Sequence, residues 1–211
     1  MSIGATVRRM FGRHERLVSE LWRSGFIDLD QFFQHVRTWV PSPTRVLEIG
    51  CGEGAGTERL AAAYPEASIL SIDIASNLGR LYRGPHDRVS FQQIAVTDLA
   101  KVQAGTFDLI IMCDVLHHIP SELRSEIVSA VRALLVPGGS FVCKDWARSL
   151  TPIHWMAYAA DRWLTGDRIR YATPVEAERL FSRSFGTSAV RARTTIRPWR
   201  NNFALLLQAS A

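Results

Sequence analysis

A glycine-rich turn that follows a short apolar run is the feature that most constrains this chain of 211 residues. The apolar run 46–49 contains one acidic residue, Glu48, and glycines then stand at positions 50, 52, 54 and 56. Glycine takes positive φ angles and lets a ligand approach the main chain, while the start of a helix offers unpaired N–H groups. The pattern therefore predicts a strand, a tight turn and a helix that together hold a nucleotide-like ligand.

A second acidic residue, Asp73, closes the next apolar run and stands 25 positions after Glu48. This interval is close to the roughly 20 residues expected for a carboxylate that accepts hydrogen bonds from ribose hydroxyls. The turn itself, read as Gly50-x-Gly52-x-x-Ala55, also fits the pattern of dinucleotide-binding turns. Asp73 is therefore predicted to bind a ribose, with the identity of the nucleotide left open by these residues.

Apolar runs of strand length alternate with helix-like segments through the middle of the chain. This alternation predicts an α/β fold with a doubly wound, mostly parallel sheet and helices on both faces. Ligands of such sheets bind at the carboxyl ends of the strands, where the strand order reverses. The expected strands are 45–50, 68–73, 89–94, 107–113, 139–145, 187–196 and 202–209, and the expected central helices are 55–64, 76–83 and 121–135.

We expect one domain over residues 1–211, with the cofactor-binding core at 44–146. Residues 1–43 are amphipathic and predict a helical cap, which either packs on the sheet or covers the substrate pocket; contact with an anionic membrane surface is a less favoured alternative. Residues 147–186 predict a helical insertion that serves as a substrate lid. Residues 187–211 predict a C-terminal hairpin.

Composition and charge narrow the class of protein. The chain has a formal net charge of +5, but its arginines are spread along the sequence, so nucleic acid is not the favoured partner. No stretch reaches the roughly 18 apolar residues of a membrane span, and no signal peptide is recognised. The three cysteines predict buried thiols in a reducing, cytoplasmic compartment, and no cysteine and histidine spacing suits a metal site.

Four motifs in a fixed order carry a family resemblance. The runs E-I-G-C-G-E-G, S-I-D-I, F-D-L-I-I-M-C-D-V-L-H-H-I and L-V-P-G-G-S-F-V together resemble the class I S-adenosylmethionine-dependent methyltransferases, in their small-molecule branch. The resemblance covers about residues 44 to 145. It implies a Rossmann-like sheet of seven strands with an antiparallel C-terminal hairpin, S-adenosylmethionine as cofactor and S-adenosylhomocysteine as product.

The resemblance also implies roles for individual residues. Glu48 would orient the methionine amino end, Asp73 would hold the ribose, and the Cys113 carbonyl would accept from the methionine ammonium. One departure concerns adenine: Ala95 stands where the family often has an acid, so either Asp98 reaches back or the backbone near Ala95 and Val96 contacts the base. The implied cofactor residues are Glu48, Gly50, Cys51, Gly52, Asp73, Ile74, Ala95, Val96, Asp98 and Cys113.

Three titratable residues near expected strand ends are candidates for catalysis. His117 and His118 follow the fourth strand, and imidazole titrates near neutral pH, so either can take a proton from an acceptor; the alternative is that they pack or cap a helix. Asp145 ends the fifth strand and is a further candidate. In the insertion, Trp155, Tyr158 and Trp163 either line an acceptor pocket or belong to an ordinary core.

The sequence thus predicts a methyltransferase that acts at O, N or C of a small apolar or aromatic acceptor. Alternatives are an RNA or protein methyltransferase, an NAD-dependent oxidoreductase that uses the same turn, and a cofactor-binding protein without catalysis. A contiguous basic surface would favour RNA, and preferential binding of NAD⁺ would favour the oxidoreductase.

Overall fold

The computed structural model describes residues 12–160 and 169–210, and its seven strands form one sheet in the order β3-β2-β1-β4-β5-β7-β6. Strands β1 to β5 are parallel, and β7 pairs antiparallel with both β5 and β6. The doubly wound sheet and the antiparallel hairpin are therefore confirmed. The strands are β1 Arg45–Ile49, β2 Ser68–Asp73, β3 Val89–Gln93, β4 Phe107–Cys113, β5 Leu135–Trp146, β6 Val190–Ile196 and β7 Asn202–Gln208.

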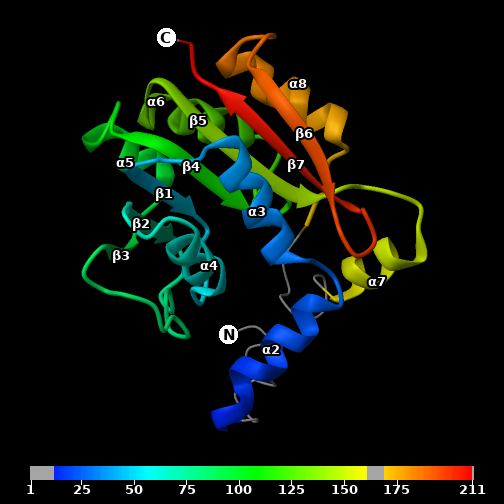
Figure 1. Cartoon of the computed structure of the whole chain (residues 1–211). Coiled ribbons are helices and arrows are strands. Elements are labelled where there is room, and N and C mark those ends of the chain that lie inside the picture. Colours follow the sequence, from blue (N-terminus) through cyan, green and yellow to red (C-terminus); the bar gives the residue numbers. More distant parts are fainter. Residues whose placement is uncertain (1–11, 161–168, 211) are drawn as a thin grey trace.

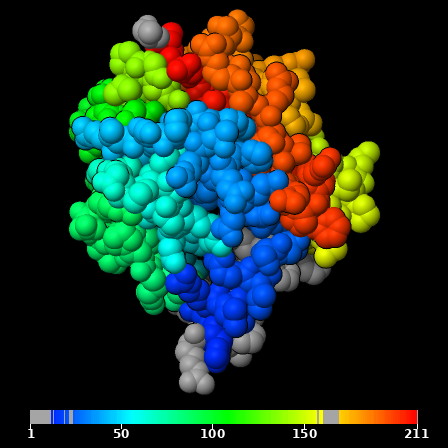
Figure 2. Space-filling view, viewed as in Figure 1, coloured from blue at the N-terminus to red at the C-terminus, as the bar shows by residue number. Residues whose placement is uncertain are grey.

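Helices cover both faces of the sheet (Figure 1). On one face, α5, α6 and α8 bury apolar side chains against β1, β4, β5 and β7, and on the other face α3 and α4 do the same. Figure 2 views the second face, where the blue α3 lies between the cyan region of α4 and the orange-red hairpin. The helices are η1 Gly12–His14, α2 Glu15–Ser24, α3 Leu29–Trp39, α4 Ala55–Ala63, α5 Val96–Val102, η2 Leu116–His118, α6 Arg124–Leu134, α7 Pro152–Ala160 and α8 Pro174–Phe185.

The strand order reverses between β1 and β4. From β1 the chain continues to β2 and β3 on one side of the sheet, and it then returns to β4 on the other side of β1. The glycine turn leaves β1 at this point, and the loop after β4 begins beside it. The carboxyl ends of β1, β2, β4 and β5 therefore meet at one edge of the sheet. Ligands of open α/β sheets bind at such an edge, so the fold brings the predicted cofactor residues and the predicted catalytic residues to the same region.

The expected helix at 76–83 is wrong, because this segment forms bends and turns. Gly79 has a φ of +65°, and a Cβ atom there would lie 2.8 Å from the ring of Phe91. The backbone N–H groups of Gly79 and Leu81 donate to the carbonyls of Gly52 and Glu53, both at 2.9 Å. These donors therefore brace the glycine turn and are not used within a helix.

Two other boundaries differ from expectation. Helix α6 begins at Arg124 and not at residue 121, because the Ser121 hydroxyl accepts from Arg170 and does not cap the helix. A short helix, α5, was not expected. Strand β5 begins at Leu135 and runs through the Pro-Gly-Gly segment, with a shift of register against β4.

The N-terminal segment is helical where it is described, as expected. Helix α3 starts at an Asp28 cap, and Phe32, Phe33 and Val36 bury its inner face in the core. Helix α2 instead projects from the body (Figure 1) and exposes Leu17 and Leu21. No helix in the described ranges has the length and apolar character needed to cross a membrane.

The C-terminal strands match their predicted environments. Strand β7 lies inside the sheet and its residues 202–207 are buried. Strand β6 alternates partly buried and exposed residues, with Arg191 and Arg193 exposed. The arginines on this strand therefore form a solvated face, as alternation with apolar residues favours.

Candidate active site

The glycine turn is held against the end of β2 and the loop after β4. The Gly50 and Cys51 N–H groups both donate to the Ile72 carbonyl, at 2.8 and 3.1 Å. Gly50 has a φ of +77°, and a Cβ atom there would lie 2.2 Å from a methyl group of Val115. Glycine is therefore required at position 50 by both conformation and space.

Glu48 is buried beneath this turn and joins β1 to α4 and β2. Its Oε2 atom accepts from the Thr57 hydroxyl at 2.5 Å and from the Ser71 hydroxyl at 2.8 Å. Burial raises the pKa of the Glu48 carboxyl, and the two hydroxyls oppose that rise. A Cβ atom at Gly56 would lie 2.6 Å from Oε1, so this carboxyl group has room only because residue 56 is glycine.

A cavity of about 350 Å³ opens beside the turn, and we call it the turn cavity. Its only basic residue among those described is Arg16, which is already paired with Glu58 at 2.5 Å. The predicted residues Glu48, Gly50, Cys51, Gly52 and Cys113 all line it. The remaining lining residues are Arg16, Glu20, Leu29, Glu53, Ala55, Gly56, Glu58, Leu81 and Asp114.

A second cavity of about 350 Å³ lies on the other side of Gly50, which lines both, and its surface is mainly apolar. We call it the apolar cavity. Asp73 stands at its edge, where its Oδ2 accepts from the Gly52 N–H at 2.8 Å and its Oδ1 from the Ala75 N–H at 2.9 Å. Of the predicted cofactor residues, Gly50, Asp73, Ile74, Ala95 and Val96 line this cavity.

Asp98 is the one predicted cofactor residue that the structure does not bring to either cavity. Its carboxylate instead accepts from Lys101 Nζ at 2.7 Å, and both side chains are largely exposed. Helix α5 begins at Val96, and the residues at its start, Ala95, Val96 and Thr97, line the apolar cavity. Of the two alternatives from the sequence, contact through the backbone near Ala95 and Val96 therefore agrees better with the geometry.

Asp145 and His117 form a buried pair beside the turn cavity. His117 Nδ1 lies 2.5 Å from Asp145 Oδ1, and both side chains are no more than 3% exposed. The Asp145 carboxylate also accepts from the backbone N–H groups of His117, at 2.9 Å, and Trp146, at 2.6 Å. Burial raises the pKa of Asp145, but His117 and these donors outweigh it and leave that pKa below its ordinary value.

Lys144, the residue before Asp145, forms a second charged pair next to the His117–Asp145 pair. Its side chain is completely buried, and its Nζ donates to both carboxylate oxygens of Asp114, at 2.6 and 2.8 Å. Asp114, which lines the turn cavity, has a φ of +58°. Asp114, His117 and Asp145 approach within 4.8 Å of one another, but Lys144 already occupies both oxygens of Asp114. A buried ammonium requires such a partner.

The sequence analysis did not assign a role to the Lys144–Asp114 pair. The signal that would have revealed it is the pairing of β4 with β5, which places Cys113 opposite Lys144. Asp114 directly follows Cys113, so its carboxylate lies close to Lys144 where the two strands end. The sequence alone does not establish this register, because β5 begins four residues earlier than expected.

None of the remaining predicted residues that the structure describes lines either cavity. The His118 ring packs 4.1 Å from that of His117, measured between centroids. Trp155 and Tyr158 contact each other on α7 but remain 58% and 37% exposed, and neither lines the two cavities. Trp163 lies outside the described residues.

Comparisons with known proteins agree with this geometry. Residues 47–141 match a family model described as a methyltransferase domain. A ubiquinone biosynthesis O-methyltransferase of Xanthomonas axonopodis pv. citri is 36% identical over 104 residues, or 47% of this chain and 41% of that enzyme. The corresponding enzyme of Nitrosococcus oceani is 31% identical over 144 residues, or 64% of this chain and 59% of that enzyme. The chain thus spans about half the length of these curated relatives.

A solved structure extends the likeness to the whole fold. The 1,6-didemethyltoxoflavin-N1-methyltransferase of Burkholderia thailandensis, with bound 1,6-didemethyltoxoflavin and S-adenosylhomocysteine, has a TM-score of 0.69 and 16% identity. The alignment covers 98% of this chain and 88% of that one. The matched segment holds the glycine turn, Asp73 and the two histidines, which favours a methyltransferase over a dinucleotide-binding oxidoreductase. Residues 47–141 therefore match a methyltransferase domain, and the whole chain has the fold of that solved methyltransferase.

Proposed function

We propose that this protein transfers the methyl group of S-adenosylmethionine to O, N or C of a small apolar or aromatic acceptor. The observation that carries the proposal is the pair of cavities joined at Gly50, one polar and acidic and the other apolar. A sulfonium nucleoside has the same division, with a charged amino acid end and a flat base. When bound, the cofactor supplies an electrophilic methyl group on a good leaving group.

The acidic end suits a cation. Glu48 and Asp114 line the turn cavity, and the Cys113 residue at its wall offers a main-chain carbonyl for the methionine ammonium. Arg16 is already paired with Glu58, so the described lining presents no unpaired cation to a diphosphate. This distribution of charge is a physical reason to favour the methionine-bearing cofactor over NAD⁺.

The apolar end suits a purine. Ile74, which is 77% exposed, projects over the apolar cavity as a cover for one face of the base. Asp73 is close enough to the turn for its carboxylate to accept ribose hydroxyls, which would compete with the Gly52 and Ala75 N–H groups. The first turn of α5 supplies N–H donors for the edge of the adenine ring.

Within this proposal, His117 is the general base and Asp145 positions it. His117 Nδ1 lies 2.5 Å from the Asp145 carboxylate, so we assign the transfer of the acceptor's proton to the other ring nitrogen, Nε2. Asp145 also stabilises the imidazolium that results. His118 is the alternative base, since it shares the loop and contacts the His117 ring.

The acceptor is proposed from chemistry and from relatives. The names of the similar enzymes specify an O-methyltransferase of ubiquinone biosynthesis and an N1-methyltransferase with a bound organic acceptor. Trp155 and Tyr158 remain proposed acceptor contacts, together with Trp163. We also propose that residues 1–211 form one catalytic domain and act in the cytoplasm, where the free thiols of Cys51, Cys113 and Cys143 would stay reduced.

Calorimetry with S-adenosylhomocysteine and NAD⁺ in parallel tests the cofactor assignment. We expect saturable binding of S-adenosylhomocysteine and none of NAD⁺ at the same concentrations. Binding of NAD⁺ alone would refute the proposal. A panel of phenols, amines and heterocycles, scored for methylated product by mass spectrometry, then identifies the acceptor class.

A further inference from the structure

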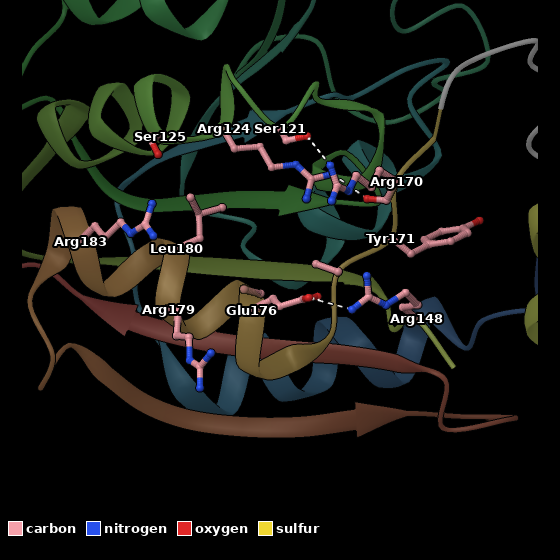
Figure 3. Close-up of a pocket in the computed structure, with 12 residues that line it drawn as sticks. Ser121, Arg124, Ser125, Arg148, Arg170, Tyr171, Glu176, Arg179, Leu180 and Arg183 are labelled. Carbon is pink, nitrogen blue, oxygen red and sulfur yellow. Dashed lines mark hydrogen bonds and ion pairs between the residues drawn. The ribbon is translucent and has the colours of Figure 1, made fainter. Parts of the chain in front are cut away.

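A third cavity, of about 390 Å³, lies between α6 and α8, and we call it the arginine cavity (Figure 3). Five arginines and a single acid, Glu176, are among its described lining residues, so the formal charge of the lining is +4. The arginines come from α6, α8 and the two segments that lead toward α8. They are Arg124, Arg148, Arg170, Arg179 and Arg183.

The single acid of the arginine cavity is already engaged. Glu176 accepts from Arg148 at 2.7 Å and from the Thr173 N–H at 2.8 Å, where it completes the capping box of α8. These contacts lower the pKa of Glu176, first through the Thr173 N–H. Within the described ranges, no carboxylate lies at ion-pair distance from the four other arginines.

Arg124 is the most constrained of these cations. It is 8% exposed, and it donates through Nε to the Ile119 carbonyl at 3.0 Å and through Nη2 to the Arg170 carbonyl at 2.6 Å. Burial lowers the pKa of this guanidinium and the positive charge of Arg170 lowers it further, while the charges of Asp145 and Glu176 oppose the shift without forming an ion pair with it. Neutral carbonyls fix its orientation but do not balance its charge, so a buried cation is held in place ready for an anion.

Arg170 lies next to Arg124 on the same wall. Its Nη1 donates to the Ser121 hydroxyl at 3.0 Å, and Figure 3 shows Ser121, Arg124 and Arg170 together across the cavity from Glu176 and Arg148. Two neighbouring guanidinium groups repel each other unless an anion lies between them. The hydrogen bonds of Arg124 to backbone carbonyls and of Arg170 to Ser121 hold the two guanidinium groups close together despite this repulsion.

We propose that the arginine cavity binds a phosphate-type dianion, either free phosphate or the phosphate group of a small ester. Guanidinium forks match the oxygens of phosphate, and the excess of charge exceeds what a single carboxylate balances. The hydroxyls of Ser121 and Ser125 add short donors at the rim. The cavity lies away from the glycine turn, and the inference does not depend on methyl transfer.

The site also contacts the proposed base. Tyr171 lines the arginine cavity, and its ring lies 4.9 Å from the ring of His117. The Arg170 N–H donates to the His117 carbonyl at 2.9 Å. Segment 170–171 therefore separates the anion site from the His117–Asp145 pair.

Calorimetry on the full chain with sodium phosphate, and with sodium acetate at matched ionic strength, tests the proposal. We expect saturable phosphate binding and at least about tenfold weaker acetate binding, since a monoanion uses fewer of the guanidinium donors. The variants are Arg183→Gln, an exposed residue, and the double variant Arg170→Gln with Arg183→Gln. The double variant should weaken phosphate binding about tenfold or more, and Arg183→Gln alone by a smaller factor.

The matched control is Arg45→Gln with Arg191→Gln, which removes the same charge from exposed positions on β1 and β6. This control should leave phosphate affinity within about twofold of the parent. A phenyl phosphate titration separates a free anion from an ester, and binding of either supports the site. Absence of saturable phosphate binding, equal acetate binding, or equal loss in the control would overturn it.

A short single-stranded RNA covers the macromolecular alternative. If RNA binding fell equally in the control and in the cavity variants while free phosphate failed to bind, the arginines would form part of a general polyanion surface. That result would also overturn the proposal. Unchanged thermal unfolding of each variant shows that the comparison is between folded proteins.

Discussion

The turn cavity and the arginine cavity are similar in volume, about 350 and 390 Å³, but they differ in charge and in how that charge is balanced. The acids of the turn cavity have cations nearby: Arg59 pairs with Glu20, Arg80 with Glu53 and Lys144 with Asp114. Most arginines of the other cavity have no such carboxylate among the described residues. The net charge of +5 is therefore not evenly divided between the two sites, and the arginine cavity is the one whose charge is mostly unpaired among the described residues.

The two cavities are joined by a short series of contacts. Asp114 at the turn cavity binds Lys144, the next residue Asp145 binds His117, and His117 packs against Tyr171 at the arginine cavity. If each site binds the kind of ligand that its lining favours, both ligands lie next to the same proposed catalytic pair, His117 and Asp145. The predictions below test this contrast, from the largest effect to the smallest.

Asp145→Asn should produce the largest change. The amide cannot hold the His117 tautomer or stabilise its imidazolium, so turnover should fall by about 10³-fold. Steady-state assays measure this loss, and the affinity for S-adenosylhomocysteine should stay within about twofold because Asp145 does not line either cofactor cavity. Turnover near the parent value would remove the pair from the mechanism.

His118→Ala separates the two histidines. If His117 is the base, this variant should lose no more than about tenfold in turnover, whereas His117→Ala should lose about 10² or more. The pH dependence of kcat/KM for the two variants provides a second readout. A larger loss in His118→Ala would transfer the role of base to His118.

Lys144→Met should destabilise the fold by about 2–3 kcal/mol, below the range for a fully buried pair because Asp114 is 36% exposed. The substitution leaves the Asp114 carboxylate without its cation at the wall of the turn cavity. Urea unfolding measures the change. The double variant with Asp114→Asn should recover part of the loss, and an additive result would show that the two residues do not interact energetically.

Asp73→Ala should weaken S-adenosylhomocysteine binding by about 1.5–3 kcal/mol, the scale for a charged hydrogen-bond partner. Asp98→Ala is the matched control, because the Asp98 carboxylate accepts from Lys101 on the same helix and does not line either cavity. Calorimetry compares the two. Equal affinities in the two variants would exclude Asp73 from the cofactor site.

Glu48→Gln should have the smallest effect on stability, and its sign should depend on pH. The folded-state pKa of Glu48 is raised, so the folded parent loses stability as pH rises from the unfolded-state pKa through the folded-state pKa. The Gln variant lacks this loss and should therefore gain on the parent between acidic and neutral pH. Urea unfolding across that range measures the difference in stability. A Gln variant that lost stability relative to the parent as pH rose would contradict the assignment.

Much of the fold could be predicted because its signals are local. Apolar runs of strand length located all seven strands of the sheet. The helix expected at 76–83 failed because its N–H groups bond to Gly52 and Glu53, residues more than 25 positions away. Such distant partners leave no periodic pattern within the segment itself.

In the candidate site, residues at strand ends could be predicted from the sequence, whereas residues whose position depends on distant contacts could not. Gly50, Asp73 and Cys113 follow strand ends, and strand ends meet at one edge in a parallel sheet. Asp98 is one of two alternatives that the sequence leaves open for the adenine contact, and the sequence pattern does not predict α5, on which its side chain meets Lys101. The arginine cavity was not found at all, since its residues come from α6, α8 and the intervening segment and share no motif.

The position of β7 has a consequence for how the molecule folds. Strand β5 carries Lys144 and Asp145, which pair with Ala204 and Phe203 of a strand that begins 56 residues after β5 ends. Contacts over such separations form slowly, because a long loop must close first. Until that strand docks, one edge of β5 at Lys144 and Asp145 has no backbone partner, so we expect the segment that carries these two buried charges to complete its pairing late in folding.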